Sequence, residues 1–141
     1  MANTDLVLKM YDYYGKGDME SIKRELFHPD ITWTMPGHHP LSATMEGADA
    51  VFAFFGALFE VGITVDDVHF GELDDGTVVE THMAHGTVGD EEFLLPTCTT
   101  YGVRDGRLFS VRVHPGDQHN VDRYFWTVCT LKGIPAHWAA A

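Results

Sequence analysis

The sequence predicts an α+β domain in which a curved antiparallel sheet wraps around a pocket and is covered by three N-terminal helices. Two observations support this fold class. Apolar residues recur at helical spacing as far as Val61, and from there the pattern changes to strand-like alternation broken by short polar turns. Helices followed by hairpin-connected strands are typical of α+β domains. The 141 residues contain no linker, repeat or low-complexity segment, so we expect residues 1–141 to form a single domain.

The first two helices are predicted from their apolar stripes and their end signals. The first helix ends at Gly15 and Gly17, which are common helix terminators. Asp18 is a suitable N-cap for the second helix, which stops at the Pro29 region. The apolar stripes consist of Leu6, Val7, Met10 and Tyr14 in the first helix and of Met19, Ile22 and Leu26 in the second.

A short strand over residues 31–35, a turn-rich loop over residues 36–40 and a third helix over about residues 48–61 come next. The third helix is apolar over more than half of its circumference, so it must be buried on several sides. Its apolar residues are Val51, Phe52, Phe54, Phe55, Leu58 and Phe59.

Four strands are predicted in the second half, over residues 63–73, 77–88, 91–103 and 107–114. Short turns rich in Asp and Gly separate them, which indicates sequential hairpins and hence an antiparallel arrangement. A concave sheet of this kind, covered by the large third helix, forms a cone with a ligand-sized pocket.

In the tail, residues 117–141, more than one residue is suited to start a helix. Asp117 or Asn120 is a suitable cap for a short helix carrying Val121, Tyr124, Phe125 and Val128. We expect the segment after this helix to fold back over the mouth of the pocket.

Charge and composition exclude several function classes. Nine Lys and Arg against 21 Asp and Glu give a net charge of −12, which argues against binding of nucleic acids and other polyanions. The longest apolar stretch, residues 51–59, is too short to span a membrane, and the first residues lack the apolar core of a signal peptide. The two cysteines, Cys98 and Cys129, form no recognisable disulfide framework. We therefore expect a cytoplasmic protein that binds a small, apolar organic molecule.

Several short segments together resemble the SnoaL-like polyketide cyclases. They are Phe27-His28-Pro29-Asp30-Ile31-x-Trp33, Pro36-Gly37, Pro40-Leu41, Gly47-Ala48-Asp49-Ala50-Val51 and Phe54-Phe55. That family belongs to the nuclear transport factor 2-like fold, together with ketosteroid isomerase and limonene epoxide hydrolase. Over roughly residues 4–128 the resemblance implies a cone-shaped barrel with a deep apolar pocket, no cofactor and a homodimer formed through the outer face of the sheet.

The polar groups that carry chemistry in these relatives are replaced in this chain. By the resemblance, the base carboxylate of the isomerase falls at Met35, its proton-donating carboxylate at Thr99 and its helix-one tyrosine at about Met10. The catalytic aspartate of the cyclases and of the hydrolase falls at Val113. We therefore expect neither the isomerase mechanism nor the aspartate-centred aldol cyclisation in its familiar form.

The strand at 77–88 offers a replacement. Glu80, His82 and Ala84 share one face, because alternate residues of a strand point the same way. By the resemblance, His82 falls where the epoxide hydrolase has a pocket arginine. A buried histidine beside a carboxylate is suited to acid or base catalysis near neutral pH. The alternative is a structural histidine on a polar sheet face.

Two aromatic residues, Trp33 and Tyr101, are turned inward by the resemblance and combine a flat apolar surface with a hydrogen-bond donor. They are candidates for stacking on a substrate, and Tyr101 for donating to a developing oxyanion. Plain core packing is the alternative for both. Thr97 and Thr99 share the face of Tyr101 and offer weaker hydrogen bonds.

Further candidates for the pocket come from other elements. His38 follows the first strand and is expected near the pocket mouth, and Tyr14 lies on the stripe of the first helix. The predicted catalytic residues are thus His82, Glu80 and Tyr101. The predicted substrate-binding residues are Trp33, Met35, His38, Tyr14, Phe55, Leu58, Thr97, Thr99 and Val113. Although the chain has nine histidines, none falls in a familiar metal-ligand spacing, so we expect neither a metal nor a cofactor.

Two function classes remain open. The first is a cofactor-independent cyclase or isomerase that acts by acid–base catalysis on an apolar, polyketide-like molecule, including ring closure by epoxide opening or hydroxyl addition. The second is a non-catalytic binding or assembly domain of the same fold, which accounts for the missing carboxylates.

Overall fold

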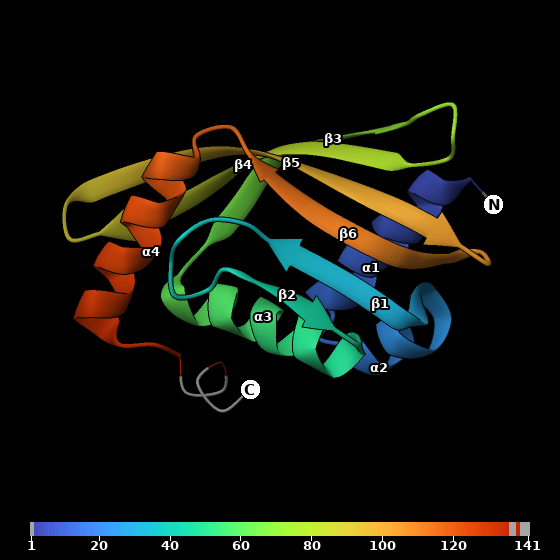
Figure 1. Ribbon diagram of the computed structural model, residues 1–141, viewed down its shortest axis with the longest axis horizontal. Coiled ribbons are helices and arrows are strands. Elements are labelled where there is room, and N and C mark those ends of the chain that lie inside the picture. Colours follow the sequence, from blue (N-terminus) through green and yellow to red (C-terminus); the bar gives the residue numbers. More distant parts are fainter. Residues whose placement is uncertain (1, 136–137, 139–141) are drawn as a thin grey trace.

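The computed structural model describes residues 2–135 and 138. Six strands form one sheet in the order β2-β1-β6-β5-β4-β3, with two free edges, so the sheet is curled but not closed (Figure 1). The strands are β1 (Phe27–Met35), β2 (Ala43–Glu46), β3 (Thr64–Glu72), β4 (Val78–Val88), β5 (Glu91–Arg104) and β6 (Arg107–Pro115). The helices are α1 (Asn3–Gly15), α2 (Met19–Ser21), α3 (Ala48–Val61) and α4 (Gln118–Lys132), and a π-helical turn, η1 (Ile22–Leu26), follows α2.

The prediction of an α+β fold is confirmed, with one correction to the sheet. Strands β3 to β6 form the expected antiparallel meander, but β1 pairs with β6 in parallel. The reason is topological: α3 carries the chain from β2 to the opposite edge of the sheet, and three hairpins then bring it back beside β1. The sheet is therefore mixed.

The helices also differ in part from the prediction. The second predicted helix is present over residues 19–26, but only α2 is α-helical and the rest is the π-helical turn η1. It ends just before the Pro29 region, because Phe27 already enters β1 and pairs with Leu108 of β6. The pairing of β1 is irregular between Phe27 and Thr32, around Pro29, which has no N–H to donate. Helix α3 has the predicted bounds and ends at Gly62, whose φ of 89° is the left-handed conformation that glycine adopts without strain.

Strand β2 escaped prediction. It lies at the edge of the sheet, pairs only with β1, and buries a single side chain, that of Met45. A four-residue strand of this kind carries no alternation that the sequence pattern can reveal.

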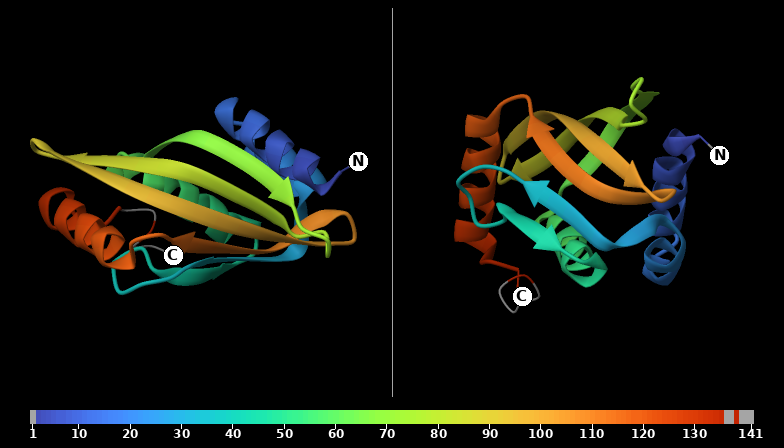
Figure 2. Two further views of the ribbon diagram at one scale, coloured as in Figure 1. Left: turned by 90° about the horizontal axis from the view of Figure 1, so that it is seen from above. Right: turned by 45° about the vertical axis from the view of Figure 1, so that its right-hand side comes forward.

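Helix α4 is a fourth covering element. Asp117 caps it by accepting a hydrogen bond from the backbone N–H of Asn120 at 3.0 Å, as the sequence suggested, but the helix is 15 residues long rather than short. Figure 2 shows α1 and α3 on one side of the curled sheet, with α4 at the end away from the N-terminus. None of the helices in the described part of the chain is long and apolar enough to cross a membrane.

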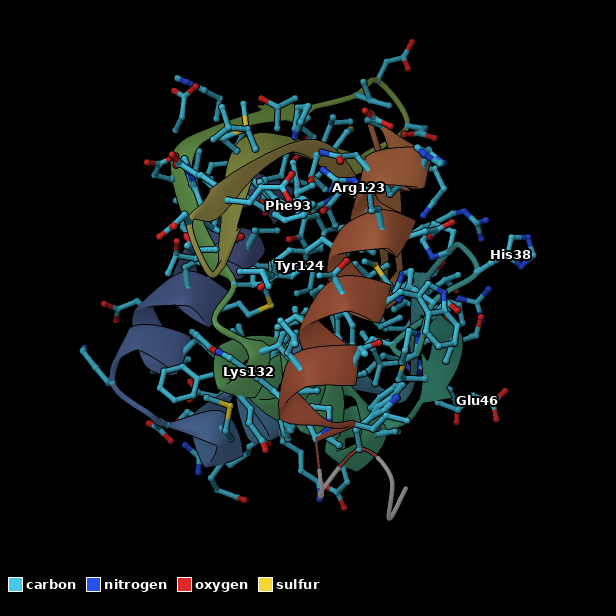
Figure 3. All side chains as sticks on the ribbon, turned by 90° about the vertical axis from the view of Figure 1, so that its left-hand side faces the viewer. His38, Glu46, Phe93, Arg123, Tyr124 and Lys132 are labelled. Atoms are coloured by element: carbon cyan, nitrogen blue, oxygen red, sulfur yellow. The ribbon has the colours of Figure 1, made fainter. Side chains whose placement is uncertain are left out.

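Helix α4 is held closely against the sheet. The ring of Tyr124 is fully buried, packs edge-on against Phe93 of β5, and donates its hydroxyl to the carbonyl of Val61 at 2.9 Å (Figure 3). Gly86 of β4 makes room for this ring, because a Cβ built on Gly86 falls 2.3 Å from Cε1 of Tyr124. The close approach explains the glycine within this strand.

The loop after β1 is tied to the same helix. Gln118 donates to the carbonyl of Pro36, Trp126 donates to the carbonyl of His38, and the backbone N–H of His38 donates to Asp122. The buried ring of His39 stacks on Phe125. These contacts hold the loop and α4 together as one wall of the domain.

Candidate functional site

A cavity of about 460 Å³ lies between the inner face of the sheet and the helices α1, α3 and α4. Eleven of the twelve side chains predicted for the site line this cavity. They are Tyr14, Trp33, Met35, Phe55, Leu58, Glu80, His82, Thr97, Thr99, Tyr101 and Val113. The cavity is bounded mainly by apolar and aromatic groups, and the described residues that line it include no Lys or Arg.

The prediction for His38 is wrong in its placement. The side chain is exposed, does not line the cavity, and projects away from the domain in Figure 3. The reason is that its loop is tied to α4 through backbone bonds, which leaves the imidazole outside. The exposed residues among those that line the cavity lie instead at the ends of α1 and α3 and at the start of β3. They are Tyr14, Gly15, Phe59, Thr64 and Val65, and they mark the mouth.

The tail contributes to the pocket in a different way from the one expected. Helix α4 itself closes one end of the cavity with Val121 and Phe125. Trp138 does not line the cavity: its ring lies beside Phe54, and its Nε1 donates to the carbonyl of Pro40 at 2.9 Å. The terminal segment therefore does not cover the mouth at Trp138, and residues 136–137 and 139–141 lie outside the described part of the chain.

The polar centre of the cavity wall is a cluster around Glu80. This side chain is 0 % exposed, and its carboxylate has three hydrogen-bond partners within the protein. The hydroxyl of Tyr101 donates to Oε1 at 2.6 Å, the hydroxyl of Tyr11 donates to Oε2 at 2.7 Å, and Nδ1 of His82 hydrogen-bonds to Oε2. We call these four residues the Glu80 cluster. A buried carboxylate is tolerated only when hydrogen bonds replace its hydration, and these bonds do so.

Strand geometry explains why the cluster forms. Glu80 and His82 lie two residues apart on the inner face of β4, as alternation predicts. Tyr101 sits opposite Val78 in the neighbouring strand β5, one inward position away from Glu80. Helix α1 lies against β3 and β4 and brings Tyr11 to the same carboxylate.

A β-bulge lies beside the cluster. The pairing of β3 with β4 shifts register between Asp66 and His69, so that two residues of β3 oppose His82 alone. Asp67 in this bulge has a φ of 51°. Bulges bend the strand and redirect nearby side chains, and they are common next to functional sites.

Burial and the Glu80 carboxylate act together on the two tyrosines. Burial is the larger cause and the nearby negative charge the second, and both raise the pKa of Tyr101 well above its ordinary value. The same two causes raise the pKa of Tyr11. Both hydroxyls therefore stay protonated in the physiological range and act as donors.

The second nitrogen of His82 is the open position of the cluster. Its Nδ1 is engaged by Glu80, whereas Nε2 has no hydrogen-bond partner among the described residues. The side chain is 10 % exposed and lines the cavity, so Nε2 is not sealed in the core as Nε1 of Trp33 is. The site thus combines a histidine–carboxylate pair with an apolar cavity, which is an arrangement suited to acid–base chemistry on a buried molecule.

Aromatic rings form the wall next to the cluster. Trp33 meets Phe55 and Tyr101 in edge-to-face contacts, with ring centroids 5.0 and 5.9 Å apart. Tyr101 was expected to donate a hydrogen bond to an oxyanion. Its hydroxyl has a single proton, and in the structure this proton is directed at Glu80 instead. Trp33 and Tyr101 are both buried and both line the cavity, so each residue packs in the core and also forms part of the cavity wall.

Tyr11 is the member of the cluster that the sequence analysis missed. The predicted residue of this helix, Tyr14, is 39 % exposed and lies at the mouth against Phe55. A signal was present, because Val7, Tyr11 and Tyr14 follow the i, i+4, i+7 spacing of one helix face. Among the described residues, no group of three or more His, Cys, Asp or Glu is placed to hold a metal ion.

Comparison with known proteins adds a family. A family model described as a SnoaL-like domain matches residues 7–111. A search of curated proteins found no match.

Solved structures show the same architecture. Bal32a, from a soil-derived mobile gene cassette, is 28% identical, with a TM-score of 0.76, over 88% of this chain and 95% of its own. An NTF2-like protein from Burkholderia xenovorans is 23% identical, with a TM-score of 0.72, over 87% of this chain and 95% of its own. SalBIII, described as an epoxide hydrolase/cyclase-like enzyme with a role in pyran ring formation in the polyether salinomycin, is 20% identical, with a TM-score of 0.62, over 81% and 90% of the two chains. At 23% and 20% identity, the second and third of these similarities establish the fold alone.

Proposed function

Because the chain belongs to the SnoaL-like domain family, we propose that it is a cofactor-independent cyclase or isomerase that acts by acid–base catalysis on a small, neutral, apolar molecule. The observation that carries this proposal is the histidine–carboxylate pair in the wall of an otherwise apolar cavity. A non-catalytic binding domain requires no such pair, and burying Glu80 costs free energy that a plain apolar wall does not.

The proposed substrate class follows from the lining of the cavity. With no Lys or Arg among the described lining residues and a carboxylate in the wall, a phosphate or carboxylate ligand lacks a partner there. The aromatic rings of Trp33, Phe54 and Phe55 favour a flat or cyclic apolar skeleton. The volume of about 460 Å³ lies in the ordinary range for small-molecule sites, which is roughly 300–1,000 Å³.

Ring closure by epoxide opening is the reaction that we favour. A hydroxyl oxygen of the substrate attacks an epoxide carbon, the C–O bond of the epoxide breaks, and the released oxygen takes up a proton. His82 of the pair takes up the proton of the attacking hydroxyl and passes it to the released oxygen, so that the overall reaction is an isomerisation without an external reactant. The description of SalBIII, an enzyme of the same fold, supports this type of reaction.

Turnover of a hydroxy-epoxide tests the proposal. The probe is a neutral aryl-substituted 4,5-epoxy alcohol, whose closure to a cyclic ether is followed by chiral chromatography. We expect wild-type protein to accelerate closure and His82→Gln to lose at least about a hundredfold, the typical contribution of a general acid or base. His119→Gln, an exposed histidine at the start of α4, is the matched control and should keep wild-type activity.

Two outcomes contradict the proposal. If His82→Gln closes the ring as fast as wild type, the pair is not the catalytic group. If the protein binds the apolar probe but accelerates neither closure nor isomerisation, the second function class, a non-catalytic binding domain, is favoured.

A homodimer through the outer face of the sheet is the assembly that we propose. Ser110, Arg112 and His114 of β6 alternate with the buried Val111 and Val113 and are exposed on that face. Sedimentation velocity tests this assembly: a dimer that dissociates in Arg112→Glu supports it, and a wild-type monomer at micromolar concentration contradicts it.

A further inference from the structure

We infer that Glu80 does not itself exchange a proton with the ligand, but is held by Tyr11 and Tyr101 as a positioning residue, so that Nε2 of His82 is the group of the cluster that contacts the substrate. The inference rests on the proposed function and assigns separate roles within the same site. It also gives a role to Tyr11, on a helix remote in sequence from the other three residues.

The Glu80 carboxylate is enclosed by its hydrogen-bond partners. Both oxygens have partners: Oε1 accepts from Tyr101, and Oε2 accepts from Tyr11 and is hydrogen-bonded to Nδ1 of His82. The side chain has no exposed surface. A base that takes a proton from a ligand needs a free lone pair within hydrogen-bond reach of that ligand. Three partners take up three of the roughly four lone-pair positions of the carboxylate, and because the side chain has no exposed surface, a ligand reaches the remaining position only by displacing a partner. A buried donor left without a partner is costly.

The hydroxyls of Tyr11 and Tyr101 are both committed to Glu80. A phenol has a single proton to donate, and Tyr11 and Tyr101 both direct theirs at Glu80 over short distances of 2.7 and 2.6 Å. Their raised pKa values agree with a donor role. Neither hydroxyl is therefore available to protonate the ligand while Glu80 is in place.

The bond to Glu80 determines the tautomer of His82. An ionised carboxylate only accepts hydrogen bonds, so Nδ1 of His82 carries the proton that it shares with Oε2. In the neutral imidazole this leaves a lone pair on Nε2, which has no partner among the described residues. His82 is thus set up as a base through Nε2, with Glu80 fixing the tautomer and the direction of the ring.

Tyr11 is the less obvious of the two holding residues. It comes from α1, whereas Glu80, His82 and Tyr101 all belong to the sheet. Its ring packs edge-on against Phe70 of β3, with centroids 6.1 Å apart. Tyr11→Phe therefore keeps the ring contact and removes only the hydroxyl, which makes it a clean test.

Nuclear magnetic resonance of the imidazole tests the inference without any substrate. The full chain is labelled with ¹⁵N-histidine, and the His82 signals are assigned by their loss in His82→Gln. In the wild type above neutral pH, we expect a proton on Nδ1, a bare Nε2 and a downfield Nδ1 proton resonance. In Tyr11→Phe we expect this resonance to shift or to broaden beyond detection, because Oε2 is no longer held in place.

Tyr13→Phe is the matched control. Tyr13 lies on the same helix, and its hydroxyl donates to the carboxylate of Glu25 at the surface at 3.0 Å, away from the cluster. We expect it to leave the His82 signals unchanged. Tyr101→Phe removes the other holding hydroxyl and serves as the second test if Tyr11→Phe does not fold.

Two results overturn the inference. One is a wild-type His82 with its proton on Nε2, and the other is a His82 signature that stays as in the wild type when the hydroxyl of Tyr11 or of Tyr101 is removed. Neither depends on turnover. Failure of the proposed function would instead appear as a missing reaction with the epoxy alcohol while the NMR signature of the cluster is intact.

Discussion

Replacing Gly86 by alanine tests how α4 is held against the sheet. Gly86 lies near the end of β4, directly beneath the buried ring of Tyr124. A Cβ at this position falls 2.3, 2.4 and 2.8 Å from Cε1, Cζ and the hydroxyl oxygen of that ring. Ordinary contacts of this kind are 3.4–4 Å, so ring and strand must move apart by about an ångström.

The expected cost follows from opposing effects. Forcing extra volume into a packed core costs about 1–3 kcal/mol. Replacing glycine by alanine returns about 0.4–1 kcal/mol, because the unfolded chain loses conformational freedom. The net expectation is a loss of about 1–2 kcal/mol, more if the hydroxyl of Tyr124 also loses its bond to the carbonyl of Val61.

Urea denaturation followed by circular dichroism measures this loss as a fall in the free energy of unfolding. Gly71→Ala is the matched control: Gly71 lies in β3, has no positive φ, and has nothing within 4 Å of a built Cβ. We expect Gly71→Ala to be neutral or slightly stabilising. In a Tyr124→Leu background the ring is gone, so Gly86→Ala should there cost at least about 1 kcal/mol less than it does in the wild type.

Two results would refute this reasoning. The first is a Gly86→Ala protein within about 0.5 kcal/mol of the wild type, the usual range of harmless surface changes. The second is the same cost with and without the ring of Tyr124, which would place the clash elsewhere.

Three further outcomes are expected. Asp117→Ala removes the N-cap of α4 and should lower the free energy of unfolding by about 1 kcal/mol in urea denaturation, whereas no loss would show that the cap is dispensable. Burial lowers the pKa of His39 in the folded protein below the ordinary 6.5. As the pH falls below 6.5, His39 therefore takes up a proton in the unfolded chain before it does so in the folded protein, and stability is lost. His39→Gln should therefore weaken the fall in Tm between pH 7 and about pH 5, and an unchanged slope would contradict the assignment. Half-buried His85, whose pKa the hydrogen bond to Asp66 raises, acts in the opposite direction and remains in both proteins. Calorimetry should show 2-naphthol binding at least about tenfold more tightly than 2-naphthoate, because no cation among the described lining residues compensates the carboxylate, and equal affinities would rule out a neutral pocket.

His38, β2 and the pairing of β1 differ from the sequence-based expectations for one reason. His38 stands next to predicted pocket residues in the chain, yet its imidazole is exposed because the loop is tied to α4 by main-chain bonds. Strand β2 and the parallel pairing of β1 with β6 depend on which edge of the sheet a segment meets. Local residue patterns do not predict such pairings and tethers, because these arise from contacts between segments that are distant in the sequence.

The sequence by itself determined the fold class, the bounds of α3 and most of the cavity wall. The physical reason is that periodicity is a local property: alternation along β4 puts Glu80 and His82 on one face whatever lies opposite. Tertiary structure alone decided what meets that face. The bond from Tyr11 to Glu80 joins residues 69 positions apart, and only the packing of α1 against the sheet creates it.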